Sequence, residues 1–192
     1  IDIGCGTGIY TLPLAKEAQF VFGLDISSEM LTRLIAEAKK LKINNIETLH
    51  VSWQEIDLDL NGLKGSFDIA WTSLSPAITH SSDVIKMMDC SKEWCIYVDY
   101  GEKRDNPVLE NALTAHGLNY RKESPASKFI KILVSLGIEY TKDVLETSWT
   151  WRGTKSELIE DLSMLIEFRG GEPNFETLKN IVDTLGEDHI IK

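Results

Sequence analysis

The chain has little cysteine, and its three thiols, Cys5, Cys90 and Cys95, form no C-x-x-C pair. An odd number of cysteines without such a pair argues against a disulfide framework and against a zinc site, so we expect no metal. The chain also lacks an apolar run long enough to cross a bilayer, and the sequence therefore predicts no membrane span. A reducing cytoplasm is the simplest compartment for such a protein.

Basic side chains are also scarce. The 20 Lys and Arg residues stand against 30 Asp and Glu residues, which gives a formal net charge of -10. This charge repels a polyphosphate backbone at long range, so nucleic acid is disfavoured as a partner. The 192 residues contain no internal repeat and suit one domain. Because the chain opens inside a strand pattern and not with Met, we expect a fragment that lacks N-terminal residues.

A loop with glycine at every second position follows the first strand pattern. Residues 1–8 read Ile-Asp-Ile-Gly-Cys-Gly-Thr-Gly, a short β-branched run that leads directly into the glycines. Glycine lets a backbone approach a ligand without a Cβ, and the free N–H groups at the start of the next helix can bind polar groups. An ordinary strand-to-helix turn is the alternative.

Strands and helices alternate beyond this loop. Apolar periodicity predicts helices near 9–18, 29–41 and 83–90, and apolar runs predict strands near 20–24, 46–51, 67–72 and 94–98. Neighbouring parallel strands need long return connections. The alternation therefore predicts an α/β fold, with a doubly wound, mostly parallel sheet and helices on both faces.

Residues 101–192 form the C-terminal half of the predicted single domain. Helices are expected near 107–116 and 127–136, and the extended stretch from Ile138 to Trp151 is predicted to be a sixth strand. A capping-box pattern begins at Thr154, and Asn174 caps a last helix. We therefore expect a core over residues 1–100 and a small helical cover over residues 154–186.

The spacing of the glycines separates two classes of cofactor. Dinucleotide loops favour G-x-G-x-x-G, which would place a third glycine at position 9 or 11, where this chain has Ile9 and Thr11. The chain instead has Asp2 two places before the first glycine of a G-x-G-x-G loop. An NAD(P)-dependent oxidoreductase is therefore the weaker alternative.

Residues 1–8, together with Gly-Leu-Asp-Ile-Ser at 23–27, resemble the class I S-adenosylmethionine-dependent methyltransferases, which have a Rossmann-like fold. The resemblance covers residues 1–100 in order and spacing. It implies that the backbone from Gly4 to Gly8 lies against the methionine and ribose parts of S-adenosyl-L-methionine. It also implies that Asp25 accepts hydrogen bonds from the ribose hydroxyls, and that S-adenosyl-L-homocysteine is the product.

The predicted donor-binding residues lie at the carboxyl ends of the first four strands. Many family members carry an Asp after the third strand that binds the adenine, and this chain has no Asp there. Trp53 could stack on the adenine, or it could pack inside the protein. Gln54 could form a hydrogen bond with the edge of the adenine. For Met30, core packing is favoured over contact with the adenine. The full set is Asp2, Gly4, Cys5, Gly6, Gly8, Asp25, Ile26, Met30, Ser52, Trp53, Gln54 and Ser73.

The acceptor side is less clearly marked. The loop from Ser73 to His80 lies where the family presents substrate-facing residues, and it lacks the Asn/Asp-Pro-Pro-aromatic signature of amino-group nucleic-acid methyltransferases. His80, Asp83 and Tyr100 are weak catalytic candidates, each with a structural alternative, and His80 is favoured as a surface or helix-capping residue. The sequence thus predicts methyl transfer by direct displacement to a small-molecule acceptor, with a non-catalytic donor-binding regulatory module as the alternative.

Overall fold

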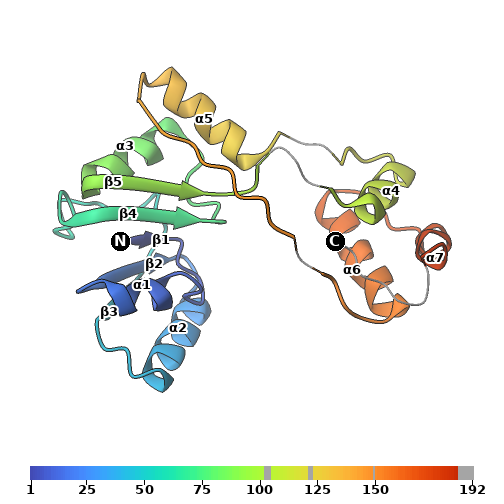
Figure 1. Ribbon diagram of the computed structural model, residues 1–192, viewed down its shortest axis with the longest axis horizontal. Coiled ribbons are helices and arrows are strands. Elements are labelled where there is room, and N and C mark those ends of the chain that lie inside the picture. Colours follow the sequence, from blue (N-terminus) through green and yellow to red (C-terminus); the bar gives the residue numbers. More distant parts are fainter. Residues whose placement is uncertain (102–104, 121–122, 149, 186–192) are drawn as a thin grey trace. The chain divides into compact units, whose positions relative to one another are not determined.

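The computed structural model describes residues 1–101, 105–120, 123–148 and 150–185 (Figure 1). The chain divides into two compact units. The first consists of Ile1–Tyr100 and Pro125–Thr141, and the second consists of Gly101–Ser124 and Lys142–Lys192. The single domain, with C-terminal helices that cover the core, therefore stays a prediction.

The first unit is built on a five-stranded sheet with the order β3-β2-β1-β4-β5 (Figure 1). All its neighbouring strands are parallel. The order reverses beside β1, where ligands bind beyond the carboxyl ends of the strands in sheets of this kind. This sheet confirms the predicted α/β class. Its strands are β1 (Asp2–Ile3), β2 (Val21–Asp25), β3 (Ile46–His50), β4 (Phe67–Ser73) and β5 (Ser91–Val98).

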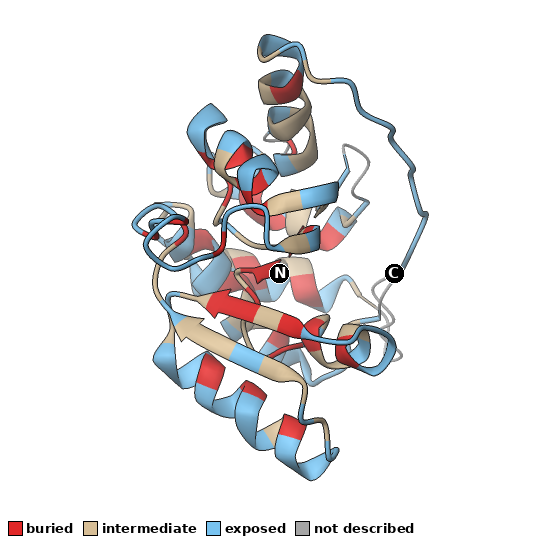
Figure 2. Cartoon of the chain, turned by 90° about the vertical axis from the view of Figure 1, so that its left-hand side faces the viewer, coloured by how far each residue is buried: buried red, intermediate tan, exposed pale blue. Residues whose placement is uncertain are grey.

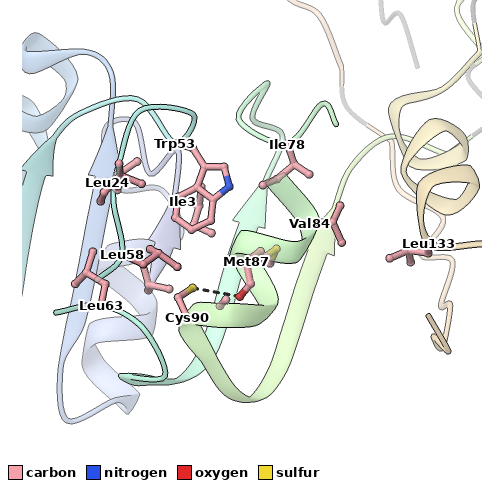
Figure 3. Close-up of a cluster of buried hydrophobic side chains, with 13 residues drawn as sticks. Ile3, Leu24, Trp53, Leu58, Leu63, Ile78, Val84, Met87, Cys90 and Leu133 are labelled. Atoms are coloured by element: carbon pink, nitrogen blue, oxygen red, sulfur yellow. Dashed lines mark hydrogen bonds between the residues drawn. The ribbon is translucent and has the colours of Figure 1, made fainter. Parts of the chain in front are cut away.

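Helices cover both faces of this sheet. The helices α1 (Thr11–Glu17) and α2 (Ser28–Lys40) pack on β2 and β3, whereas α3 (Ser81–Cys90) packs on β4 and β5 and contacts α5 (Pro125–Ser135). Right-handed crossovers place the two groups on opposite faces. The buried side chains accordingly form two separate clusters. One contains Cys5, Leu31 and Leu34, and the other includes Ile3, Leu24, Trp53 and Met87 (Figure 3).

The second unit has its own apolar core, made by α4 (Pro107–Ala115), α6 (Lys155–Phe168) and α7 (Phe175–Asp183). Thr154 and Asn174 cap α6 and α7 as predicted. Thr154 Oγ1 accepts a hydrogen bond from the N–H of Glu157, and Asn174 Oδ1 accepts one from the N–H of Thr177. The end of the predicted cover, residue 186, lies outside the described residues. In neither unit does a described helix have the length and apolar character to span a bilayer.

The prediction of a sixth strand from Ile138 to Trp151 is wrong. Residues 139–148 form no strand, and all of them are exposed (Figure 2). Even the apolar members stand in solvent, with Val144 70% and Leu145 89% exposed. A strand needs a hydrogen-bonding neighbour and a buried face. Within the described part of the chain this stretch has neither, and β5 is the last strand of the sheet.

Candidate functional site

The loop after β1 holds its three glycines in the left-handed region, with φ of 72° at Gly4, 53° at Gly6 and 85° at Gly8. A Cβ at Gly4 would collide with Ser75, and one at Gly8 would collide with Leu34, so packing requires glycine at both positions. A Cβ at Gly6 would meet no atom within 4 Å. Gly6 therefore faces open space, as a loop that holds a ligand against its backbone requires.

Asp25, at the end of β2, fixes the middle of this loop. Its Oδ2 accepts a hydrogen bond from the N–H of Gly6 at 2.8 Å, and its Oδ1 accepts one from the N–H of Ser27 at 2.8 Å. Each carboxylate oxygen has two acceptor positions, so Asp25 can still accept hydroxyl donors from a ligand. The structure thus brings Asp25 and the glycine loop together at one edge of the sheet.

Two of the predicted donor-binding residues are buried and support the loop. Asp2 is 3% exposed, and its Oδ2 accepts a hydrogen bond from the Thr11 hydroxyl at 2.6 Å. Burial raises the pKa of Asp2, and this hydrogen bond offsets part of the rise. Burial, together with the negative charges of Asp2 and Asp25, raises the pKa of the Cys5 thiol to about 12. Cys5 is therefore a protonated thiol that packs and does not act as a nucleophile.

The segment after β3 contributes a buried ring and an exposed amide. The Trp53 side chain is 1% exposed in the core with Leu24 and Ile78 (Figure 3). Its indole N–H donates to Asp83 O at 3.2 Å. Trp53 therefore packs inside the protein, because its ring has no free face on which an adenine could stack. Gln54 is exposed, and its Nε2 donates to Ala77 O at 2.6 Å.

Ile26 and Met30 stand at the surface near the start of α2. Ile26 is 72% exposed and Met30 is 40% exposed. The preference for core packing of Met30 is wrong, because this residue lies in the first turn, where its N–H donates to the capping Ser27 hydroxyl at 3.3 Å. The positions that α2 buries are Leu31, Leu34 and Ala38.

The end of β4 carries a buried hydroxyl without a partner. Ser73 Oγ makes no hydrogen bond within the described part of the chain, and the same holds for Trp71 Nε1. The Cα of Trp71 pairs with that of Asp2, so Ser73, two residues further on, lies beside the glycine loop. A buried hydroxyl without a partner costs free energy, and a polar ligand group would supply the partner.

The three catalytic candidates are placed in or beside the start of α3 and the end of β5. The Asp83 carboxylate accepts from the N–H of Thr79 at 3.0 Å, the N–H of His80 at 2.9 Å and the Thr79 hydroxyl at 3.2 Å. Burial alone would raise the pKa of Asp83, but these hydrogen bonds lower it below its ordinary value. His80 is the N-cap residue of α3, and its side chain is 76% exposed. The N–H of Tyr100 donates to Asp99 Oδ1 at 2.6 Å.

Two groups near these positions were not found by sequence reasoning. The Lys86 ammonium donates to three backbone carbonyls in the segment after β3. The Tyr97 ring stacks on Phe129 with centroids 3.9 Å apart, and its hydroxyl donates to Asp99 Oδ2 at 3.0 Å. No local pattern marks the contacts of Lys86 or the stacking of Tyr97 on Phe129, because these contacts join segments that are distant in sequence. Tyr97 and Asp99 are only two residues apart, and this pair could have been found from the sequence.

Comparison with known proteins gives three informative similarities, besides a match of residues 1–94 to the family model described as a methyltransferase domain. An uncharacterized protein of Haemophilus influenzae is 28% identical over 176 residues, which are 90% of this chain and 62% of that protein. The 23S rRNA (uracil(1939)-C(5))-methyltransferase RlmD of Vibrio cholerae is 46% identical over 46 residues, 24% of this chain and 10% of its own length. The structure of magnesium protoporphyrin IX methyltransferase (ChlM) from Synechocystis PCC 6803 with bound SAM has a TM-score of 0.53 and 18% identity, and the match covers 77% of this chain and 62% of that chain.

The sheet order, the glycine loop and the matched family model together define a Rossmann-like methyltransferase domain over residues 1–94. Residues 1–94 match the methyltransferase domain model, and this match confirms the resemblance to class I S-adenosylmethionine-dependent methyltransferases seen in the first residues. The chain spans 62% of the length of the relative from Haemophilus influenzae.

Proposed function

We propose that the whole protein is an S-adenosylmethionine-dependent methyltransferase that binds its donor between the glycine loop, Asp25 and the end of β4. The observation that carries this proposal is Gly6, which has a left-handed backbone, faces open space and has its N–H held by Asp25 at 2.8 Å. The unpartnered Ser73 hydroxyl beside the loop supports it.

When bound, S-adenosylmethionine supplies a methyl group already activated by a positively charged sulfur. The residues of the chain then have to bind, orient and shield the reactants. The backbone from Gly4 to Gly8 would lie against the donor, and Asp25 would orient the ribose hydroxyls through charge-assisted hydrogen bonds worth roughly 1.5–3 kcal/mol each. Among the remaining predicted donor residues, Ile26, Met30 and Gln54 are exposed and Ser52 is half-buried.

We further propose a small molecule as the acceptor. The support is the formal net charge of -10, which disfavours the approach of a polyphosphate. The names of the relatives point in both directions, since one acts on magnesium protoporphyrin IX and another on 23S rRNA. The expectation that nucleic acid is not a partner therefore rests on the charge and on the missing Asn/Asp-Pro-Pro-aromatic signature, and the experiment has to include RNA.

Transfer of a radioactive methyl group tests this proposal. The protein is incubated with methyl-labelled S-adenosylmethionine and, in separate reactions, with a small-molecule extract or total RNA. We expect label in the small-molecule fraction, and much less label at a subsaturating donor concentration when Asp25→Ala replaces the wild type. Label in RNA would reverse the proposed acceptor class. Donor binding without transfer to either fraction would favour the non-catalytic binding module.

A further inference from the structure

Residues 52–56, which follow β3, form a single helical turn. The N–H groups of Glu55 and Ile56 donate to Ser52 O at 3.2 Å and 3.1 Å. Ser52 Oγ also accepts from the N–H of Glu55 at 3.2 Å and donates to the Glu55 carboxylate at 2.9 Å. The start of the turn is thus capped by its own side chains. A turn this short leaves the carbonyls at its end without partners inside it.

Lys86, on α3, supplies the partners for those carbonyls. Its Nζ donates to Trp53 O at 2.9 Å, to Gln54 O at 3.0 Å and to Ile56 O at 3.1 Å. Across the described ranges no carboxylate forms an ion pair with Lys86. An ammonium has three donors, and three carbonyls take them all. A lysine at the C-terminal end of a helical turn also interacts favourably with its dipole.

The same turn is tied to α3 and to the donor side of the site. Asp83 O accepts the Trp53 indole N–H at 3.2 Å, and residues 83 and 86 are three apart and so lie on one face of α3. On its other side the turn follows Val51, whose N–H donates to Asp25 O at 3.1 Å. The turn is therefore a bridge between α3 and the strand end that carries Asp25.

We infer that Lys86 is a positioning residue for the donor site, a role that rests on the proposed function. It holds the turn 52–56, and with it Ser52 and Gln54, in the geometry that the adenosine half of the donor requires. Lys86 itself needs no contact with the donor. Because the three carbonyls converge on one point, they suit a compact ammonium better than the flat fork of a guanidinium.

Calorimetry with S-adenosylhomocysteine tests this role in the wild type, Lys86→Met, Lys86→Arg and a control, Lys64→Met. Lys64 belongs to an exposed ion pair with Asp59 at 3.8 Å and is not bonded to the turn. We expect Lys86→Met to raise Kd about tenfold, equivalent to ~1.4 kcal/mol, at unchanged stoichiometry. Lys86→Arg should recover part of the affinity, and Lys64→Met should bind like the wild type.

The stoichiometry separates positioning from a general loss of structure. If Lys86→Met merely unfolds part of the protein, the number of sites falls and Kd stays constant, which would overturn the inference. A Kd within twofold of the wild type would also overturn it. If Lys86→Met does not fold, Lys86→Arg keeps the charge but places a flat guanidinium on the three converging carbonyls, and it should still raise Kd; an unchanged Kd there refutes the role. A wild type that binds no S-adenosylhomocysteine would overturn the proposed function and the inference together.

Discussion

The two halves of the sheet's carboxyl edge use their polar groups in different ways. On the half made by β1 and β2, Asp25 holds the loop through Gly6, and Gly6 faces open space. On the half that leads into α3, Thr79, His80 and Asp83 satisfy one another in a helix cap. Groups held in place but left accessible indicate a binding site, whereas groups that satisfy one another indicate local stability. This difference is why the donor can be inferred and the acceptor cannot.

Alanine at two of the glycines gives the largest expected effects on stability. Gly4→Ala should lower the free energy of unfolding by about 3 kcal/mol, because a left-handed alanine costs ~1–2 kcal/mol and displacing Ser75 adds overpacking strain of ~1–3 kcal/mol. Gly6→Ala should lose only the backbone cost, ~1–2 kcal/mol, because open space surrounds its Cβ position. Urea denaturation measures both, and equal losses would contradict the assignment of open space to Gly6.

Removing a carboxylate from each half should separate donor binding from the acceptor side. Asp25→Ala should weaken binding of S-adenosylhomocysteine at least tenfold, ~1.4 kcal/mol, because it removes the acceptor for the ribose and frees the N–H of Gly6. Asp99→Ala, at the end of β5, removes a carboxylate that bonds Tyr97 and Tyr100 and should leave this affinity within twofold. Calorimetry on both variants checks the contrast, which fails if they lose similar affinity.

The two buried carboxylates should respond to pH in opposite directions. The folded-state pKa of Asp2 is raised, so its stabilising contribution is present below its unfolded pKa and is lost as the pH rises through the folded value. The folded-state pKa of Asp83 is lowered, so its contribution is present above its unfolded pKa and is lost as the pH falls through the folded value.

Asparagine variants make this contrast measurable. Relative to the wild type, Asp2→Asn should gain stability as the pH rises from about 3 to about 7. Asp83→Asn should be less stable by about 1 kcal/mol near neutral pH, as for the loss of a helix cap, and this deficit should shrink on acidification. Urea denaturation across this pH range checks both, and two curves with the same slope would contradict the opposite pKa directions.

The smallest expected effect is that of His80→Ala. The side chain is 76% exposed, and the backbone N–H that bonds Asp83 is retained in the variant. The free energy of unfolding should therefore change by less than about 0.5 kcal/mol, as for most surface substitutions. Binding of S-adenosylhomocysteine should not change. A large loss of affinity in calorimetry would instead move His80 into the donor site.

Local patterns in the sequence predicted most of the first unit. Each predicted strand from 20–24 to 94–98 occurs in the sheet, because apolar runs and periodicity record which residues face the core. The stretch with Val144 and Leu145 has a strand-like pattern but no neighbour in the described residues. Whether an extended segment becomes a strand depends on long-range pairing, which a local pattern does not contain.

The same division holds within the site. The glycine loop and Asp25 could be placed from the sequence because both directly follow strands, and parallel strands end at one edge. The burial of Trp53 and the contacts of Lys86 could not be predicted from the sequence, because they depend on how α3 packs on the segment after β3. The prediction that Met30 packs in the core was wrong because apolar periodicity indicates the buried face of a helix less well in the first turn, where the N-cap residue sets the direction of the chain.

Calorimetry of the wild type and Gly6→Ala with S-adenosylhomocysteine, with NADH as the competing ligand class, tests the central claim most directly. The account predicts saturable binding of S-adenosylhomocysteine to the wild type, no binding of NADH, and loss of binding in a folded Gly6→Ala, whose methyl group fills the space against which the donor lies. No binding of S-adenosylhomocysteine to folded wild type, or equal binding to Gly6→Ala, would contradict it.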